Sequence, residues 1–282
     1  MKNLSEKTIV VNLVIKGWSA RKYDKKVTQK IEEAHNAKDA GRFNKLLLAA
    51  GTGVSNINSV GQKARQYLYD NTLVWGDNGD RLLPSELYFT FIAEFNRFKA
   101  EYQTQVSKFL QDYPTLKEEA RLRLNGMYKE EDYPTVKELV KKFSMECTFV
   151  PIANLDDFRL SITQDERDAL KLQIEGDMND RLKNTGRDIL RRIKDVVFKM
   201  VDKLSNSDAT FHNTLITNIE DLIDVLPKLN ITNDSEIEDI IDKMRRLVDV
   251  RPDTLRTNTN IRNQKAQEAK AIFAQVDTLL GI

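Results

Sequence analysis

The longest regular pattern in the chain is an apolar stripe inside the proline-free segment 165–204. Its members recur every three or four residues, or at sums of these steps, as one face of an α-helix requires. They are Leu170, Ile174, Met178, Leu182, Ile189, Ile193, Val196, Met200 and Leu204. The pattern predicts one rod of about forty residues and roughly 60 Å. Such a rod needs a partner to cover its stripe.

A second long stripe, rich in aromatic residues, follows Pro84 and predicts a helix over 85–113. Its members are Leu87, Phe91, Phe95, Phe98, Tyr102, Val106, Phe109 and Tyr113. The pattern repeats about every eleven residues, which favours nearly straight packing, and residues 182–204 of the first rod have the same register. We therefore expect the two helices to pair as an antiparallel hairpin, with rings of one seam against aliphatic side chains of the other.

Two segments are rich in β-branched or alternating residues and predict strands. They are Thr8–Ile15 and Phe143–Ile152, and we expect them to lie side by side in one small sheet. Two strands alone are marginally stable, so a third strand is expected from Asn71–Trp75 or from Phe158–Ile162.

The remaining pattern predicts shorter helices between turn and breaker residues. They are expected over 24–40, 42–50, 56–70, 135–142, 209–226, 235–250 and 261–280. The predicted class is mainly α with a small β-sheet (α+β): a long helical hairpin capped by a short sheet, plus a C-terminal helical bundle. Residues 1–204 would form the first domain and residues 205–282 the second.

The composition excludes several classes of protein. The chain has 282 residues, 31% of them charged, with a formal net charge of +1. This near-neutrality argues against a general nucleic-acid coat, which would be strongly basic. One cysteine allows no internal disulfide, and two histidines with one cysteine disfavour the usual zinc sites. No apolar run approaches a membrane span, so we expect a soluble, cytoplasmic protein.

Motifs that carry chemistry are weak throughout the chain. Gly51-Thr52-Gly53 lacks the lysine of a phosphate loop and is interpreted as a helix stop. The segment 77–80 has the composition of a turn and lacks the ligand spacing of a calcium loop. Cys147, on the second strand, is interpreted as a small buried residue because no histidine or helix N-terminus lies near it in the sequence. The sequence therefore predicts no catalytic residues, no metal and no cofactor.

One cluster near the N-terminus combines basic residues with aromatic ones. Its candidate partner-binding residues are Lys16, Trp18, Arg21, Lys22, Lys25, Lys26 and Lys30. Basic residues interleaved with aromatics can bind phosphates and stack bases. The same residues are equally typical of a solvated surface beside the first strand.

The chain also resembles a family known only as a domain of unknown function in bacteriophages and bacteria. The resemblance rests on the first strand followed by Trp18-Ser19-Ala20-Arg21-Lys22, on the segment from Trp75 to Pro84, on the strand 143–150 and on the segment 219–230. Members of this family occur near MoxR-type AAA ATPases and von Willebrand A proteins. The resemblance implies a phage-type protein, located in the host cytoplasm if phage-encoded, with an AAA ATPase as a possible partner, and it implies no activity.

These observations together predict a non-enzymatic, helical interaction protein that binds a protein partner and can self-associate. The alternative is a nucleic-acid-binding accessory protein acting through the basic N-terminal segment. An enzyme is a third class, disfavoured because convergent acid, base or nucleophilic groups are not visible.

Overall fold

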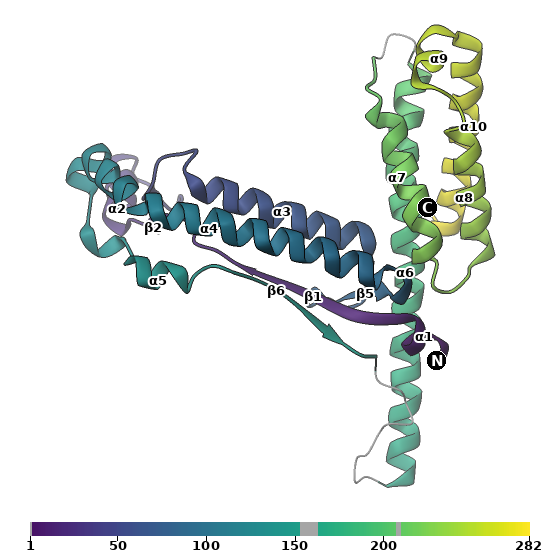
Figure 1. Cartoon of the computed structure of the whole chain (residues 1–282), viewed down its shortest axis with the longest axis horizontal. Helices are drawn as coiled ribbons and strands as arrows, with labels where there is room; N and C mark the ends of the chain where they lie inside the picture. Colours follow the sequence, from purple (N-terminus) through teal and green to yellow (C-terminus); the bar gives the residue numbers. More distant parts are fainter. Residues whose placement is uncertain (1, 153–162, 207–209) are drawn as a thin grey trace. The chain divides into compact units, whose positions relative to one another are not determined.

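The computed structural model describes residues 2–152, 163–206 and 210–282 (Figure 1). Its α-helices are α1 (Lys2–Lys7), α2 (Lys25–Ala34), α3 (Gly53–Asn71), α4 (Tyr88–Leu124), α5 (Val136–Val140), α6 (Gln164–Ser205), α7 (Thr214–Leu229), α8 (Ser235–Leu247), α9 (Pro252–Thr257) and α10 (Thr259–Leu280). Its strands are β1 (Thr8–Lys16), β2 (Arg21–Tyr23), β3 (Asn44–Leu46), β4 (Leu73–Val74), β5 (Arg81–Pro84) and β6 (Ser144–Val150). Single-turn 3-10 helices are η1 (Ser85–Leu87), η2 (Asn125–Met127) and η3 (Glu130–Asp132). The predicted class, mainly α with a small sheet, is confirmed.

The chain forms two compact units, which are described separately. Unit 1 comprises residues 1–12, 68–91 and 148–282, and unit 2 comprises residues 13–67 and 92–147. This division differs from the boundary expected at residue 204. The reason is that α6, which was assigned to the first domain, buries its stripe among the C-terminal helices.

In unit 1 the long helix α6 packs along α10, with α7 also against it. The α6–α10 pair is antiparallel, because Arg262 at the start of α10 donates to the Leu204 carbonyl (3.2 Å). Near the other end of the pair, Lys194 Nζ lies 2.6 Å from the carboxylate of Asp277. Figure 1 shows α7, α8 and α10 gathered along the C-terminal half of α6.

The expected pairing of the two long helices with each other is therefore wrong. The buried face of α6, from Thr185 to Leu204, is covered within unit 1 by α10 and α7. One stripe residue also differs: Val197 is fully buried, whereas Val196 is half-buried. The helix pattern was correct, but a stripe does not specify which apolar surface will cover it.

The first half of α6 is different, because every described side chain from Gln164 to Asn184 is half-buried or exposed. The predicted stripe residues Leu170, Ile174, Met178 and Leu182 are half-buried. This end of the helix begins with a capping box, in which Thr163 and Glu166 each bond to the other's backbone N–H.

The main sheet has the strand order β4-β5-β1-β6, which confirms that β1 lies next to β6. β4 supplies the third strand expected from 71–75, whereas the alternative at 158–162 lies outside the described residues. β5 pairs antiparallel with β1, and Ile9 lies opposite Leu83. The turn expected at 77–80 joins β4 to β5, with Gly79 at a positive φ of 88°.

In unit 2 the helices α3 and α4 lie side by side and antiparallel. The ring of Tyr67, late in α3, is 5.8 Å from that of Phe98, early in α4. At the other end, a Cβ added to Gly53 would lie 3.2 Å from Cβ of Phe109, a tight contact that glycine avoids. Gly53 thus starts α3 and stops no helix, contrary to the interpretation of Gly51-Thr52-Gly53.

Two further expectations in unit 2 are corrected. α4 continues through Pro114 to Leu124, and Tyr113 and Ala120, on either side of the proline, are both buried. Burial on both sides offsets the one backbone bond that proline removes. The segment 42–50 contains no helix; its residues 44–46 form the strand β3, which pairs antiparallel with β2. Its exposed–buried–exposed pattern around Lys45 is that of a strand.

Tyr102 provides a test of how unit 2 holds the end of β1. Its buried hydroxyl donates to the carbonyl of Lys16 at 2.6 Å. Tyr102→Phe should lower the free energy of unfolding by about 1 kcal/mol, because the carbonyl loses its partner. Tyr23→Phe, at an exposed ring, is the matched control and should change nothing measurable. Equal urea midpoints for the two variants would contradict this role.

Candidate functional site

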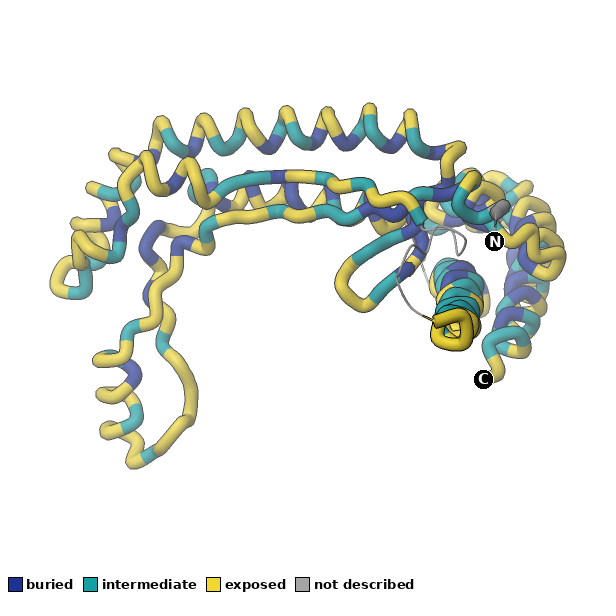
Figure 2. Tube along the Cα trace, turned by 90° about the horizontal axis from the view of Figure 1, so that it is seen from below, coloured by how far each residue is buried: buried dark blue, intermediate teal, exposed yellow. Residues whose placement is uncertain are grey.

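A groove of about 520 Å³ lies in unit 2, between the β2–β3 ribbon and α5. Trp18, Arg21 and Lys22 line it from the N-terminal segment. Pro134, Lys141 and Lys142 line it from the segment around α5. Residues 21–46, which form β2, α2 and β3 and are called the excursion below, are mostly exposed (Figure 2). The groove therefore borders an accessible part of this unit.

Four cationic side chains surround the groove: Arg21, Lys22, Lys141 and Lys142. All four residues are exposed. Within the described part of the chain, none of their side chains makes a hydrogen bond or an ion pair. These four cations outnumber the three carboxylates that also line the groove, so an anionic ligand would be favoured here.

Three carboxylates also line the groove, and each already has a partner of its own. The Asp132 carboxylate lies 2.6 Å from Lys45 Nζ and is nearly inaccessible. Glu131 is highly exposed and lies 3.8 Å from Lys129. Glu138 accepts bonds from the backbone N–H and hydroxyl of Thr135, both at 2.8 Å. Asp132 and Glu131 are thus paired with cations that do not line the groove, whereas the partners of Glu138 are neutral and its charge also attracts Lys141 and Lys142.

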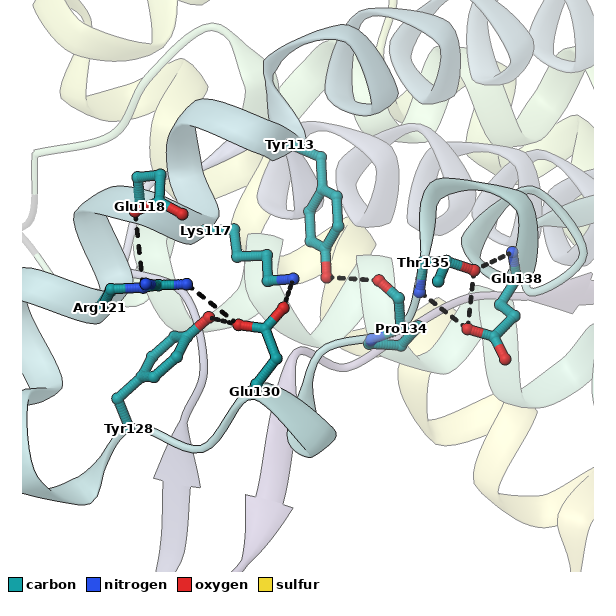
Figure 3. Close-up of polar contacts among 9 residues, drawn as sticks. All are labelled: Tyr113, Lys117, Glu118, Arg121, Tyr128, Glu130, Pro134, Thr135 and Glu138. Carbon is teal, nitrogen blue, oxygen red and sulfur yellow. Dashed lines mark hydrogen bonds and ion pairs between the residues drawn. The ribbon is translucent and has the colours of Figure 1, made fainter.

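The Glu138 contacts form a capping box at the start of α5 (Figure 3). Bonds from the backbone N–H and then from the hydroxyl of Thr135 lower the pKa of Glu138. The carboxylate is therefore ionised at neutral pH and held at the helix N-terminus, where negative charge is favourable. This geometry fixes the orientation of α5 and hence the position of Lys141 and Lys142 just after it.

A buried ion pair holds Asp132, which lines the groove, against β3. Lys45, on β3, is 2% exposed, and its ammonium group donates to Asp132 Oδ2 (2.6 Å) and to the Met127 carbonyl (2.7 Å). A buried lysine needs such partners, because an unpaired charge in this environment is costly. The pair ties β3 to the η2–η3 segment.

Two further side chains hold the end of β3. The Tyr133 hydroxyl donates to the Leu47 carbonyl at 2.8 Å, and the Arg123 guanidinium donates to the Leu46 carbonyl at 2.8 Å. Burial raises the pKa of Tyr133 to about 12, so this hydroxyl keeps its proton at neutral pH. The carbonyls of Leu46 and Leu47, at the end of β3, are thus occupied by protein donors.

A polar cluster on the neighbouring turn of α4 supports the same segment (Figure 3). Glu130 accepts hydrogen bonds from Lys117, from the Tyr128 hydroxyl (2.7 Å) and from Arg121 (3.2 Å). The bond from Lys117, followed by that from Tyr128, lowers the pKa of Glu130. Beside this cluster, the Tyr113 hydroxyl donates to the Pro134 carbonyl at 2.8 Å. These contacts anchor the loop between α4 and α5.

The structure places the sequence-predicted residues in two groups. Trp18, Arg21 and Lys22 line the groove, with the Trp18 ring centroid 6.2 Å from that of Phe109 and 5.9 Å from that of Tyr113. The other four residues are exposed and do not line it: Lys16 ends β1, and Lys25, Lys26 and Lys30 are on α2.

Lys141 and Lys142 belong to the groove but were missed by the sequence reasoning. The adjacent pair of lysines was a visible signal at the end of a predicted helix. It lies more than a hundred residues from Arg21 in the sequence, however, and the two segments come together only when the chain folds.

Other candidate chemistry is limited within the described residues. Among them, no group of three or more His, Cys, Asp or Glu side chains is arranged to hold a metal ion. Cys147 is half-buried, and burial raises the pKa of its thiol to about 12, so it is not a thiolate at neutral pH. None of the described helices combines the length and apolar character that a membrane span requires.

The groove thus combines a half-buried tryptophan with four exposed cations that form no ion pair within 4 Å among the described residues. Its features point to binding of an anionic group. No model of a known protein family, no curated protein and no solved structure matches the chain.

Proposed function

We propose that this protein is a non-enzymatic interaction protein that binds an acidic segment of a protein partner in the groove of unit 2. The observation that carries the proposal is the set of four exposed cations without ion-pair partners in the described residues, Arg21, Lys22, Lys141 and Lys142. Cations arranged around one groove attract carboxylates and steer their approach.

A protein partner is favoured over nucleic acid for two reasons. First, Glu131 and Glu138 line the same groove and would repel a continuous phosphate backbone. Second, the Trp18 ring is already engaged by Phe109 and Tyr113, which leaves less of it to stack on a base. A peptide can vary its side chains and place carboxylates at the cations alone. The family resemblance makes an AAA ATPase the first partner to test, and a second copy of this chain is the next.

The test compares two variants that lose the same number of cations. The groove variant replaces Arg21, Lys22, Lys141 and Lys142 by alanine. The control variant replaces Lys16, Lys25, Lys26 and Lys30, which are exposed but do not line the groove. The probe is a fluorescent peptide of alternating glutamate and valine, read by anisotropy. We expect the groove variant to bind at least roughly tenfold more weakly and the control variant to bind nearly as the parent does.

Two outcomes would contradict the proposal. Equal losses in both variants would mean that the peptide responds to overall charge and not to the groove. Tighter binding of a single-stranded DNA oligonucleotide, falling by orders of magnitude between about 50 and 200 mM salt, would favour the nucleic-acid alternative.

A further inference from the structure

The β2–β3 ribbon has one edge that the protein leaves open. The Leu47 N–H donates to the Ala20 carbonyl (2.8 Å), and the Asp24 N–H donates to the Phe43 carbonyl (3.0 Å). In an antiparallel ladder, residues that bond across alternate with residues whose main-chain groups point outward. The register therefore directs the N–H and C=O groups of Arg21 and Tyr23 away from β3.

The two edges of the ribbon differ in how they are covered. On the β3 side, the outward carbonyl of Leu46 accepts a bond from Arg123. On the β2 side, no described residue forms a hydrogen bond with the outward main-chain groups of Arg21 and Tyr23. An open strand edge is a template for another strand.

The strand with the open edge, β2, also lines the groove. Arg21 and Lys22 are consecutive in β2, and both are lining residues. Because consecutive residues of a strand point to opposite faces of the sheet, their two cationic side chains flank the outward main-chain groups of Arg21.

We propose that the outer edge of β2 takes up an extended acidic segment of a protein partner as an added antiparallel or parallel strand. The proposal rests on the function proposed above and specifies how the partner binds. Main-chain hydrogen bonds to Arg21 and Tyr23 would hold the segment, while its carboxylates would lie near Arg21, Lys22, Lys141 and Lys142. In this mode of recognition, the main chain provides affinity and the flanking side chains provide selectivity.

The short length of β2 explains why charge is needed as well. A strand of three residues offers few outward main-chain groups, so strand pairing alone would bind weakly. Carboxylates opposite the cations would add attraction and select acidic segments over neutral ones. Neutral extended peptides of the same length are therefore expected to bind poorly.

The experiment uses the unmodified protein and three versions of the peptide that alternates glutamate and valine. One version is unmodified, one is N-methylated at every valine amide, and one is N-methylated at every glutamate amide. All three keep the same side chains and the same charge. In an added strand, alternate residues face β2, so one methylated peptide loses its bonds while the other keeps them. We expect one to bind about tenfold more weakly and the other to bind within about twofold of the parent peptide.

Each outcome separates this inference from the function on which it rests. A clear difference between the two methylated peptides supports strand addition. Equal affinities, whether both are retained or both are lost, overturn it. If the affinities are equal but the alanine variant of the four groove cations still weakens binding of the unmodified peptide, acidic-segment binding stands and strand addition alone is wrong. If the unmodified peptide binds that variant as tightly as the parent protein, the proposed function itself fails.

Discussion

Replacing Lys45 by methionine is expected to lower the free energy of unfolding of unit 2 by about 3–5 kcal/mol. The Lys45 side chain is 1% exposed and lies 2.6 Å from Asp132, whose side chain is 7% exposed. Methionine fills a similar volume but leaves the Asp132 carboxylate buried without its counter-charge. The Met127 carbonyl also loses its donor. The loss should therefore exceed that of an ordinary surface ion pair.

Two variants separate the ion pair from other effects. Lys38→Met, at an exposed lysine of the same excursion, should change the free energy by no more than about 0.5 kcal/mol. The double variant Lys45→Met with Asp132→Leu should recover most of the loss, because no charge remains buried. Urea unfolding can be followed by the fluorescence of Trp18, which belongs to unit 2, in a Trp75→Phe background. A double variant no more stable than the single one would show that the pair is not the cause.

Replacing Met200 by aspartate is expected to lower the free energy of unfolding of unit 1 by about 3–5 kcal/mol or more. Met200 is 0% exposed and belongs to the face of α6 that α10 and α7 cover. An aspartate there must be buried as a charge or must take up a proton, and both are unfavourable. The C-terminal helices would lose their shared core at this position.

The neighbouring residue provides the control. Lys199→Asp introduces the same side chain one position earlier, but on the exposed face, and should cost at most about 0.5–1 kcal/mol. Trp75 belongs to unit 1 and can report its unfolding in a Trp18→Phe background. Similar urea midpoints for the two aspartate variants would mean that Met200 does not lie on the buried face of α6.

Local patterns in the sequence identified the long helices well. The buried residues Ile189, Ile193, Met200 and Leu204 of α6 were all predicted from helical spacing. Their period follows from the geometry of the α-helix and needs no knowledge of the rest of the fold. The adjacency of β1 and β6 was also predicted, because two β-rich segments in a mostly helical chain have few other strands to pair with.

The segment 42–50 shows where local patterns mislead. Its leucines and alanines favour a helix by intrinsic propensity. In the structure, Lys45 is drawn into an ion pair with Asp132, and the carbonyls of Leu46 and Leu47 accept bonds from Arg123 and Tyr133. All of these partners lie more than seventy-five residues away along the chain. Tertiary contacts of this kind override a weak helical preference.

The sequence by itself determined which residues are periodic, which are charged and that the chain turns at 77–80, because these properties depend on neighbours within a few residues. Part of the candidate site followed from it: Trp18, Arg21 and Lys22 were identified as a basic and aromatic cluster. Only the tertiary structure decided that α10 covers α6, and that Lys141 and Lys142 join the groove. The physical reason is that an apolar stripe or a lysine pair is compatible with many partners. The partner is selected by the combined packing of segments that are distant in the sequence.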